Sequence, residues 1–245
     1  MTEPHRTRVA DRYRYEDLRV LMTRMTGDEK HTWSATSTLD VLWVLYDRVL
    51  RVTPSTMDDP DRDRFLLSKG HGPMAYYAVL AAKGFVPVQW LNTFGQFDSP
   101  LGHHPDRVLV PGVEISSGSL GHGLPIAVGV ALGQRVQNQG AQDQRTQRQG
   151  GRTYVLVGDA ELDEGTNHEA IAYAGATGLE RLTAIVVDNQ SATHGWPGGL
   201  AARFSVNGWS TATVDGRDHE ALETALTTPS PGRPHVVVAV VEPKE

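Results

Sequence analysis

The second half of the chain alternates short apolar runs with helical segments, and this alternation limits the possible folds more than any other feature. Four runs have the character of strands that are buried on both faces of a sheet. They span residues 154–157, 182–187, 210–214 and 235–241. Buried strands separated by helices predict an α/β fold with a doubly wound, mainly parallel sheet and helices on both faces.

Apolar residues at helical spacing predict the helices. These span 13–26, 39–50, 72–83, 124–136, 167–177 and 219–226, and Ser37 or Thr38 is expected to cap the second. Residues 138–151, rich in Gln, Arg and Gly, are expected to form a flexible loop. We find no internal repeat and no linker, so residues 1–245 are expected to form a single domain.

Composition excludes several classes of protein. The formal net charge is −6 and no basic stripe with interleaved aromatics is present, which argues against a nucleic-acid binder. No apolar run approaches eighteen residues, so no membrane span is expected, and a cytoplasmic location is the default expectation. The chain has no cysteine, which removes disulfides, thiolate catalysis and cysteine-ligated metal centres.

Two of the predicted strands end in polar residues. The run 154–157 leads into Gly158, Asp159 and Ala160, and the run 182–187 leads into Asp188-Asn189-Gln190. Ligands of an open parallel sheet bind beyond the carboxyl ends of its strands. If the two strands are neighbours, Asp159 and Asn189 face one another across the binding crevice.

These residue types suit a metal-bound diphosphate. Mg²⁺ prefers six oxygen ligands at about 2.0–2.1 Å, commonly one or two carboxylates together with phosphate oxygens. One carboxylate, one amide oxygen and one backbone carbonyl supply three oxygens with a single negative charge. Two diphosphate oxygens and a water complete the octahedron. Each polar tripeptide alone is more often a simple turn, but 28 residues separate Ala160 from Asn189, which makes a chance pairing improbable.

The pair resembles the signature of thiamine diphosphate enzymes, in which Gly-Asp-Gly is followed by Asn just under thirty residues later. From about Leu18 to Val241, the chain resembles transketolases. Further segments resemble motifs of that family in the same order: 68–72 (Ser-Lys-Gly-His-Gly), 104–106 (His-Pro-Asp) with 111–114 (Pro-Gly-Val-Glu), 117–123 (Ser-Gly-Ser-Leu-Gly-His-Gly) and 161–165 (Glu-Leu-Asp-Glu-Gly).

The resemblance implies a ligand set. Asp159 and Asn189 would bind Mg²⁺ (or Ca²⁺ or Mn²⁺), with the backbone carbonyl of Ser191 as a third ligand. Gly118 to Leu120 would lie against the aminopyrimidine, and Glu164 matches a glutamate at the subunit interface. The residues expected to bind thiamine diphosphate are Gly118, Ser119, Leu120, Gly158, Asp159, Ala160, Glu164 and Asn189.

Three histidines match family positions near the thiazolium and the sugar hydroxyls: His31, His71 and His104. Imidazoles titrate near neutrality, so they suit proton transfer to and from ketose hydroxyls. His103 stands beside His104, and either residue is a candidate for the working one. The other histidines considered, His5, His168, His219 and His235, are expected to be surface or structural residues.

The chain also departs from the family pattern. Ala160 replaces the second Gly of Gly-Asp-Gly, where a methyl group would crowd the diphosphate or require a negative φ. His122 replaces a Gln, and Trp33 stands where a small residue is usual. The segment 191–199 differs too and is a candidate for reshaping the substrate entrance.

In the family, the glutamate that activates the cofactor lies in a second, pyrimidine-binding domain. No such domain is expected within 245 residues, so the resemblance implies a separate subunit carrying it, in an α2β2 assembly. The implied reaction transfers a two-carbon ketol unit from a ketose, expected to be phosphorylated, to an aldose. Two alternatives stay open: the α-subunit of a 2-oxo-acid dehydrogenase or decarboxylase, and a non-catalytic paralogue that binds a partner.

Overall fold

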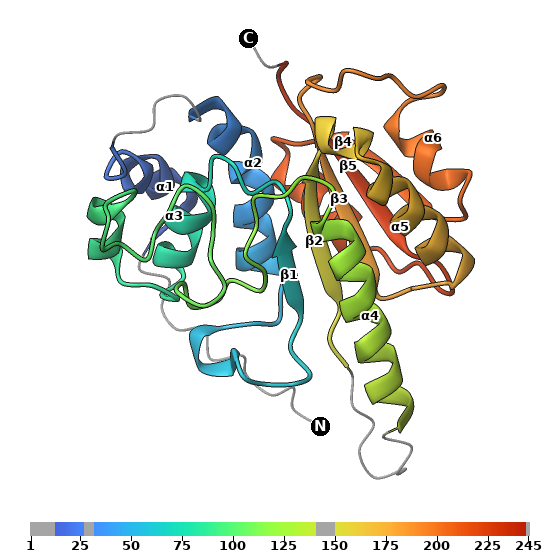
Figure 1. The fold of residues 1–245 in the computed structure, drawn as a ribbon, viewed down its shortest axis with the longest axis horizontal. Helices are drawn as coiled ribbons and strands as arrows, with labels where there is room; N and C mark the ends of the chain where they lie inside the picture. Colours follow the sequence, from blue (N-terminus) through green and yellow to red (C-terminus); the bar gives the residue numbers. More distant parts are fainter. Residues whose placement is uncertain (1–12, 27–31, 141–149, 244–245) are drawn as a thin grey trace.

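A single parallel sheet organises the structure. The computed structural model describes residues 13–26, 32–140 and 150–243. Within them, the strand order is β1-β2-β3-β5-β4 (Figure 1). The strands are β1 (Arg64–Leu67), β2 (Thr153–Gly158), β3 (Leu182–Asp188), β4 (Ser210–Asp215) and β5 (His235–Val240). The predicted α/β fold and its four strands are confirmed, but β4 is not buried on both faces: it lies at the edge of the sheet, and its residues alternate between half-buried and exposed. β1 was not predicted, because its apolar run is only three residues long and follows a charged segment.

The helices are α1 (Tyr15–Met22), α2 (Thr32–Val44), α3 (Met74–Ala82), α4 (Gly123–Gly140), α5 (Gly165–Ala176), α6 (Leu200–Ser205) and α7 (His219–Thr227). A π-helical turn, Leu45–Val49, extends α2, and 3₁₀ turns span Pro54–Thr56, Val88–Thr93 and Ala160–Asp163.

Two predictions need correction, and one helix was not predicted. Ser37 and Thr38 do not cap α2 but lie inside it, and the Thr38 hydroxyl donates to the Ala35 carbonyl within the helix. The predicted loop 138–151 is helical up to Gly140, and its residues 141–149 lie outside the described residues. The six-residue α6 is too short for its apolar spacing to have indicated a helix.

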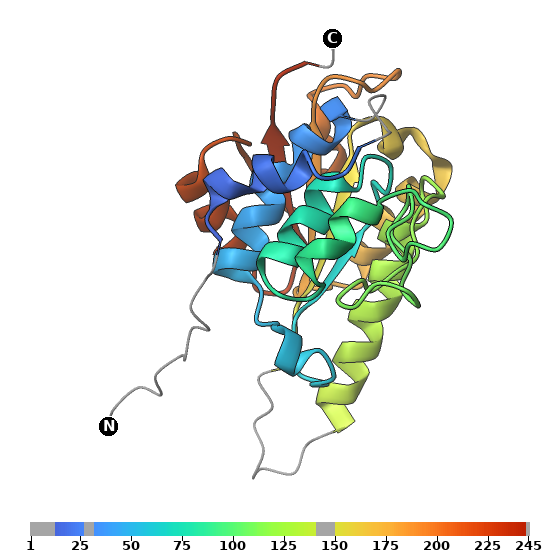
Figure 2. The same ribbon diagram turned by 90° about the vertical axis from the view of Figure 1, so that its left-hand side faces the viewer.

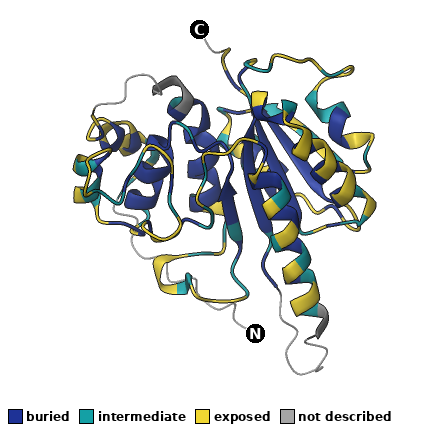
Figure 3. Cartoon of the chain, in the orientation of Figure 1, coloured by how far each residue is buried: buried dark blue, intermediate teal, exposed yellow. Residues whose placement is uncertain are grey.

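Alternating strand residues build two cores, one on each face of the sheet. Tyr154 and Leu156 pack with α1, α2, α3 and α7, whereas Val155 and Val157 pack with α4, α5 and α6. Figures 2 and 3 show these helical layers and the buried sheet between them. Successive side chains of a strand point to opposite faces, so a sheet covered on both sides requires apolar residues at every position. In the described part of the chain, no helix is long and apolar enough to cross a membrane.

Candidate active site

Asp159 and Asn189 meet at the carboxyl ends of two paired strands. β2 and β3 are parallel neighbours with Gly158 opposite Val187, and the Asp159 N–H donates to the Val187 carbonyl. The Ser191 hydroxyl oxygen lies 2.7 Å from both Asp159 Oδ1 and Asn189 Oδ1. Asp159 and Asn189 therefore lie close together at this edge of the sheet, as expected. Asp159 and Asn189 are both buried.

The chemistry of this cluster fits a divalent cation. A serine hydroxyl has one proton, so Ser191 can donate to only one of the two oxygens beside it. The other oxygen keeps an acceptor position open, and a hard cation satisfies several such oxygens at once. Among the described residues, no group of three or more His, Cys, Asp or Glu side chains could hold a metal alone. A hard cation bound by few protein side chains commonly completes its coordination with phosphate oxygens and water, as expected for a metal bound together with a diphosphate. Ser191 brings its hydroxyl to the cluster, and the ligand role of its carbonyl stays a prediction.

Backbone conformation around the cluster is unusual at one residue. Gln190, between Asn189 and Ser191, has φ of 56° and is the only non-glycine residue with positive φ in the described part. Such strain in a side chain-bearing residue is concentrated at functional sites. Ala160, by contrast, begins a 3₁₀ turn without positive φ, and its side chain is exposed. The methyl group at 160 is therefore accommodated without backbone strain.

Two glycines, Gly70 and Gly123, allow two loops to pack closely at this edge of the sheet. A Cβ on Gly70 would lie 2.4 Å from the Ser117 hydroxyl oxygen, and a Cβ on Gly123 would lie 2.2 Å from Ser68. Real Cβ atoms do not tolerate such distances, so only glycine permits the segments 68–72 and 117–123 to pack this tightly. Likewise, the side chain of Lys69 lies 3.2 Å from the position of a Cβ on Gly158.

Glu161 connects these loops to the end of β2, and sequence analysis gave it no role of its own. Its Oε1 accepts hydrogen bonds from the Ser68 hydroxyl, in a short contact, and from the Gly121 N–H at 3.0 Å. The Asn167 amide donates to the Glu161 carbonyl at 2.6 Å. Burial raises the pKa of the Glu161 carboxyl, while the bonds from Ser68 and Gly121 oppose that rise. Its buried Oε2 has no hydrogen-bond partner.

The structure separates the two adjacent histidines. The His104 ring lies 3.2 Å from the position of a Cβ on Gly118, so it faces the loop expected to contact the aminopyrimidine. The His103 ring instead packs against Gly95 and, at 5.2 Å between ring centroids, against Phe94. This geometry favours His104 as the residue at the site.

The remaining predicted residues fall into three groups. His71 is half-buried beside Gly70, which adjoins the 117–123 loop. Ser119, Leu120 and Glu164 are exposed at the same edge, where a partner chain could cover them. His31 lies outside the described residues.

Comparison with known proteins identifies the class of domain. The family model described as "Transketolase, thiamine diphosphate binding domain" matches residues 14–240. The chain is therefore a thiamine diphosphate-binding domain, and it belongs to the transketolase family.

The chain is similar to two curated relatives and to a solved transketolase structure. The chain is 55% identical to "Ferredoxin fas2" of Rhodococcoides fascians over 94% of its own length and 72% of that protein. It is 36% identical to a protein of Actinobacillus succinogenes that is named as one subunit of an apulose-4-phosphate transketolase, over 85% of its length and 75% of that protein. Among solved structures, the transketolase from Leishmania mexicana matches 93% of this chain with a TM-score of 0.78 and 26% identity. The match spans only 36% of that transketolase, so the chain corresponds to about a third of a full-length enzyme.

Proposed function

We propose that residues 1–245 form a single domain that binds the diphosphate of thiamine diphosphate in a two-chain transketolase. The observation that carries this proposal is the convergence of Asp159, Asn189 and Ser191 at the ends of neighbouring strands. These residues would hold Mg²⁺, or Ca²⁺ or Mn²⁺, together with the diphosphate. The expected cytoplasmic location stays a prediction.

A second chain would complete the site. The relative from Actinobacillus succinogenes is named as one of the subunits of a transketolase, and this chain covers three-quarters of it. Helices α4 and α5 lie side by side on one face of the sheet (Figure 1) and leave apolar side chains exposed there and on the preceding loop. These are Leu120, Ile126 and Tyr173, which are 43%, 43% and 50% exposed. These three side chains are our candidate contacts for a partner chain. We propose an α2β2 assembly with a pyrimidine-domain subunit.

Each of the predicted site residues would then have its own role in the reaction. Thiamine diphosphate supplies, when bound, a nucleophilic carbon and an electron sink for the two-carbon unit. Gly118, Ser119 and Leu120 would support the aminopyrimidine, while Glu164 contacts the partner. His104 and His71, with His31, would move protons at the hydroxyls of a ketose phosphate and an aldose.

A calorimetric titration tests the shared site. Thiamine diphosphate and Mg²⁺ are titrated into this chain mixed with its pyrimidine-domain partner, and into each chain alone. We expect strong heat only from the mixture, and ketol transfer from ketose phosphates by the same mixture. Absence of binding in all three titrations would instead support the non-catalytic paralogue.

Replacement of the adjacent histidines tests the assignment of His104. His104→Ala should lower kcat/KM by about 100-fold or more, the usual contribution of a general acid or base. His103→Ala, which removes a ring packed on Phe94, should change kcat/KM by less than about threefold. Equal losses in the two variants would contradict the assignment.

The relative named ferredoxin favours a second candidate reaction. In it, a 2-oxo acid and water would give carbon dioxide, a carboxylic acid one carbon shorter, two protons and two electrons. Two one-electron iron–sulfur carriers would take the electrons. Residues 1–245 contain no cysteine, so the ligands of these clusters would lie outside this sequence. Anaerobic bleaching of an added ferredoxin by the loaded mixture with a 2-oxo acid, but not with a ketose phosphate, would support this candidate over ketol transfer.

A further inference from the structure

Two carboxylates of one short segment hold the loop that follows Asn189. Asp159 Oδ2 accepts hydrogen bonds from the backbone N–H groups of Ser191 at 2.6 Å and Ala192 at 3.1 Å. Asp163 Oδ2 accepts from the next two, Thr193 and His194, both at 3.2 Å. Four consecutive backbone N–H groups therefore end on two carboxylates at either end of the 3₁₀ turn Ala160–Asp163.

The other end of this loop, at Trp196, contacts Arg203, which in turn bonds to the segment that follows Asp159. The guanidinium carbon of Arg203 lies 5.3 Å from the centroid of the Trp196 ring. A cation in this position is attracted to the face of the aromatic ring. Arg203 is buried and donates to the Leu162 carbonyl, in a short contact, and to His168 Nε2 at 2.6 Å. The segment 191–196 is thus held at its start by Asp159 and Asp163 and at its end by contacts of Trp196 with Arg203 and His168.

This fastening acts on a strained part of the backbone. Gln190 has φ of 56° and stands directly before the four anchored N–H groups. A left-handed conformation at a residue with a side chain persists only where the surrounding contacts enforce it. Without Asp163, Asp159 alone would have to hold the loop in this conformation while also binding a cation. Asp163 instead accepts two of the four backbone hydrogen bonds. Asp159 Oδ1 is then left with a single neighbour from the loop, the Ser191 hydroxyl.

We infer that Asp163 is a positioning residue for the divalent cation. It holds Ser191 to His194 in their binding conformation before the cation and cofactor arrive, and it does not itself contact either. The inference rests on the proposed function, because the cation is the one assigned to Asp159, Asn189 and Ser191.

The test compares two variants of Asp163 with a matched control. Asp163→Ala removes the acceptor, Asp163→Asn keeps an oxygen acceptor but removes the charge, and both are expected to fold because Asp163 is only half-buried. The control is Asp215→Asn, since Asp215 accepts one loop N–H, that of Arg217 at 2.8 Å, at the end of β4. Amide hydrogen exchange is measured on the chain alone without metal, and Mg²⁺ affinity on the complex with its partner and thiamine diphosphate.

We expect Asp163→Ala to accelerate exchange at Thr193 and His194 at least about tenfold and to weaken Mg²⁺ binding by about 10- to 100-fold. Asp163→Asn should fall between the wild type and Asp163→Ala, the control should match the wild type, and all four melting temperatures should agree. Wild-type Mg²⁺ affinity in Asp163→Ala would overturn the inference and leave the proposed function intact. A wild-type complex that binds no Mg²⁺ would overturn the proposed function and this inference with it.

Discussion

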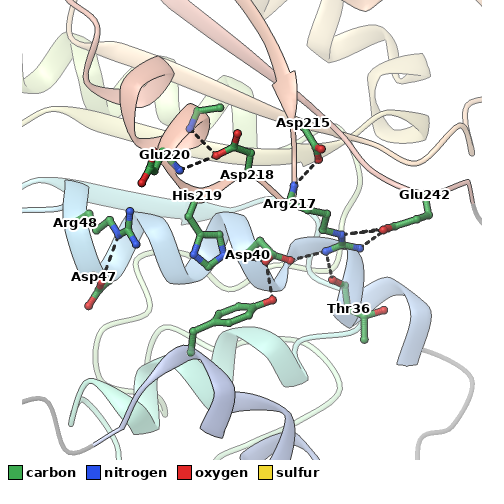
Figure 4. A network of polar contacts seen from close by, with 12 residues as sticks. Thr36, Asp40, Asp47, Arg48, Asp215, Arg217, Asp218, His219, Glu220 and Glu242 are labelled. Carbon is green, nitrogen blue, oxygen red and sulfur yellow. Dashed lines mark hydrogen bonds and ion pairs between the residues drawn. The ribbon is translucent and has the colours of Figure 1, made fainter.

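The carboxyl edge of the sheet contains two buried aspartates that differ in the partners of their carboxylates. At the ends of β2 and β3, Asp159 accepts hydrogen bonds only from backbone N–H groups and a serine hydroxyl, and no described Lys, Arg or His forms an ion pair with it. Beside the ends of β4 and β5, Asp40 of α2 accepts from Arg217 at 2.6 Å and contacts His219 at 2.9 Å. Figure 4 shows Arg217 between Asp40 and Glu242.

The difference separates a structural carboxylate from one that is available to a ligand. Asp40 is already paired with a guanidinium, and it also accepts a hydrogen bond from Tyr15 at 2.6 Å. Burial and this bond raise the pKa of Tyr15 to about 12, so Tyr15 stays a neutral donor. Neutral donors orient Asp159 as well, but they leave its negative charge uncompensated. A buried carboxylate of that kind favours a cation, and among the described residues no Lys, Arg or His supplies one through an ion pair with it.

The largest expected effect comes from removing the charge of Asp159. Asp159→Asn should weaken binding of Mg²⁺ with thiamine diphosphate by at least about 100-fold, because the site has no other carboxylate. Its free energy of unfolding should change by less than about 1 kcal/mol, since the amide retains an acceptor for the loop N–H groups. Calorimetry and urea unfolding measure the two quantities. An affinity within about threefold of the wild type would place the cation elsewhere.

Breaking the other cluster should have the opposite pattern. Arg217→Ala should lower the free energy of unfolding by about 2 kcal/mol, because it leaves Asp40 buried without its guanidinium. The loss is smaller than for a fully buried pair, since the Arg217 side chain is 32% exposed and Tyr15 and His219 still contact Asp40. Cofactor affinity should not change.

Glu242→Gln is the control for that variant. Glu242 pairs with the same guanidinium but is 68% exposed, so its loss should cost less than about 0.5 kcal/mol. Urea unfolding of both variants makes the comparison. Similar losses in the two would show that burial of Asp40 does not govern this cluster.

The same comparison shows what the sequence could reveal. Asp159 and Asn189 were predictable because each follows a run of apolar residues, and the carboxyl ends of parallel strands meet at one edge. Glu161 and Asp163 were quoted only as parts of a motif. Their partners, Ser68 and the loop at 193–194, are 93 and about 30 residues away, and pairing at such separations follows from the folded loops rather than from local spacing.

The sequence also could not distinguish between adjacent residues in irregular loops. His103 and His104 have the same chemistry, and no periodicity applies in a loop to show which side each faces. The close approach of His104 to Gly118 distinguishes them, and it is a tertiary contact. β1 was not predicted for a related reason, because a strand of four residues is recognisable mainly by its pairing with β2.

The smallest expected effect concerns Glu161, a buried carboxyl that joins the two loops. Burial raises its pKa in the folded chain, so its contribution to stability is fully present below the unfolded pKa and is lost as pH rises through the folded pKa. Glu161→Gln keeps an oxygen for Ser68 and Gly121 and cannot ionise. Relative to the wild type, its free energy of unfolding should therefore rise by about 1 kcal/mol between pH 4.5 and pH 8. Urea unfolding across that range measures the difference between the two proteins. A difference that stays flat, or falls as pH rises, would show that the bonds from Ser68 and Gly121 outweigh burial.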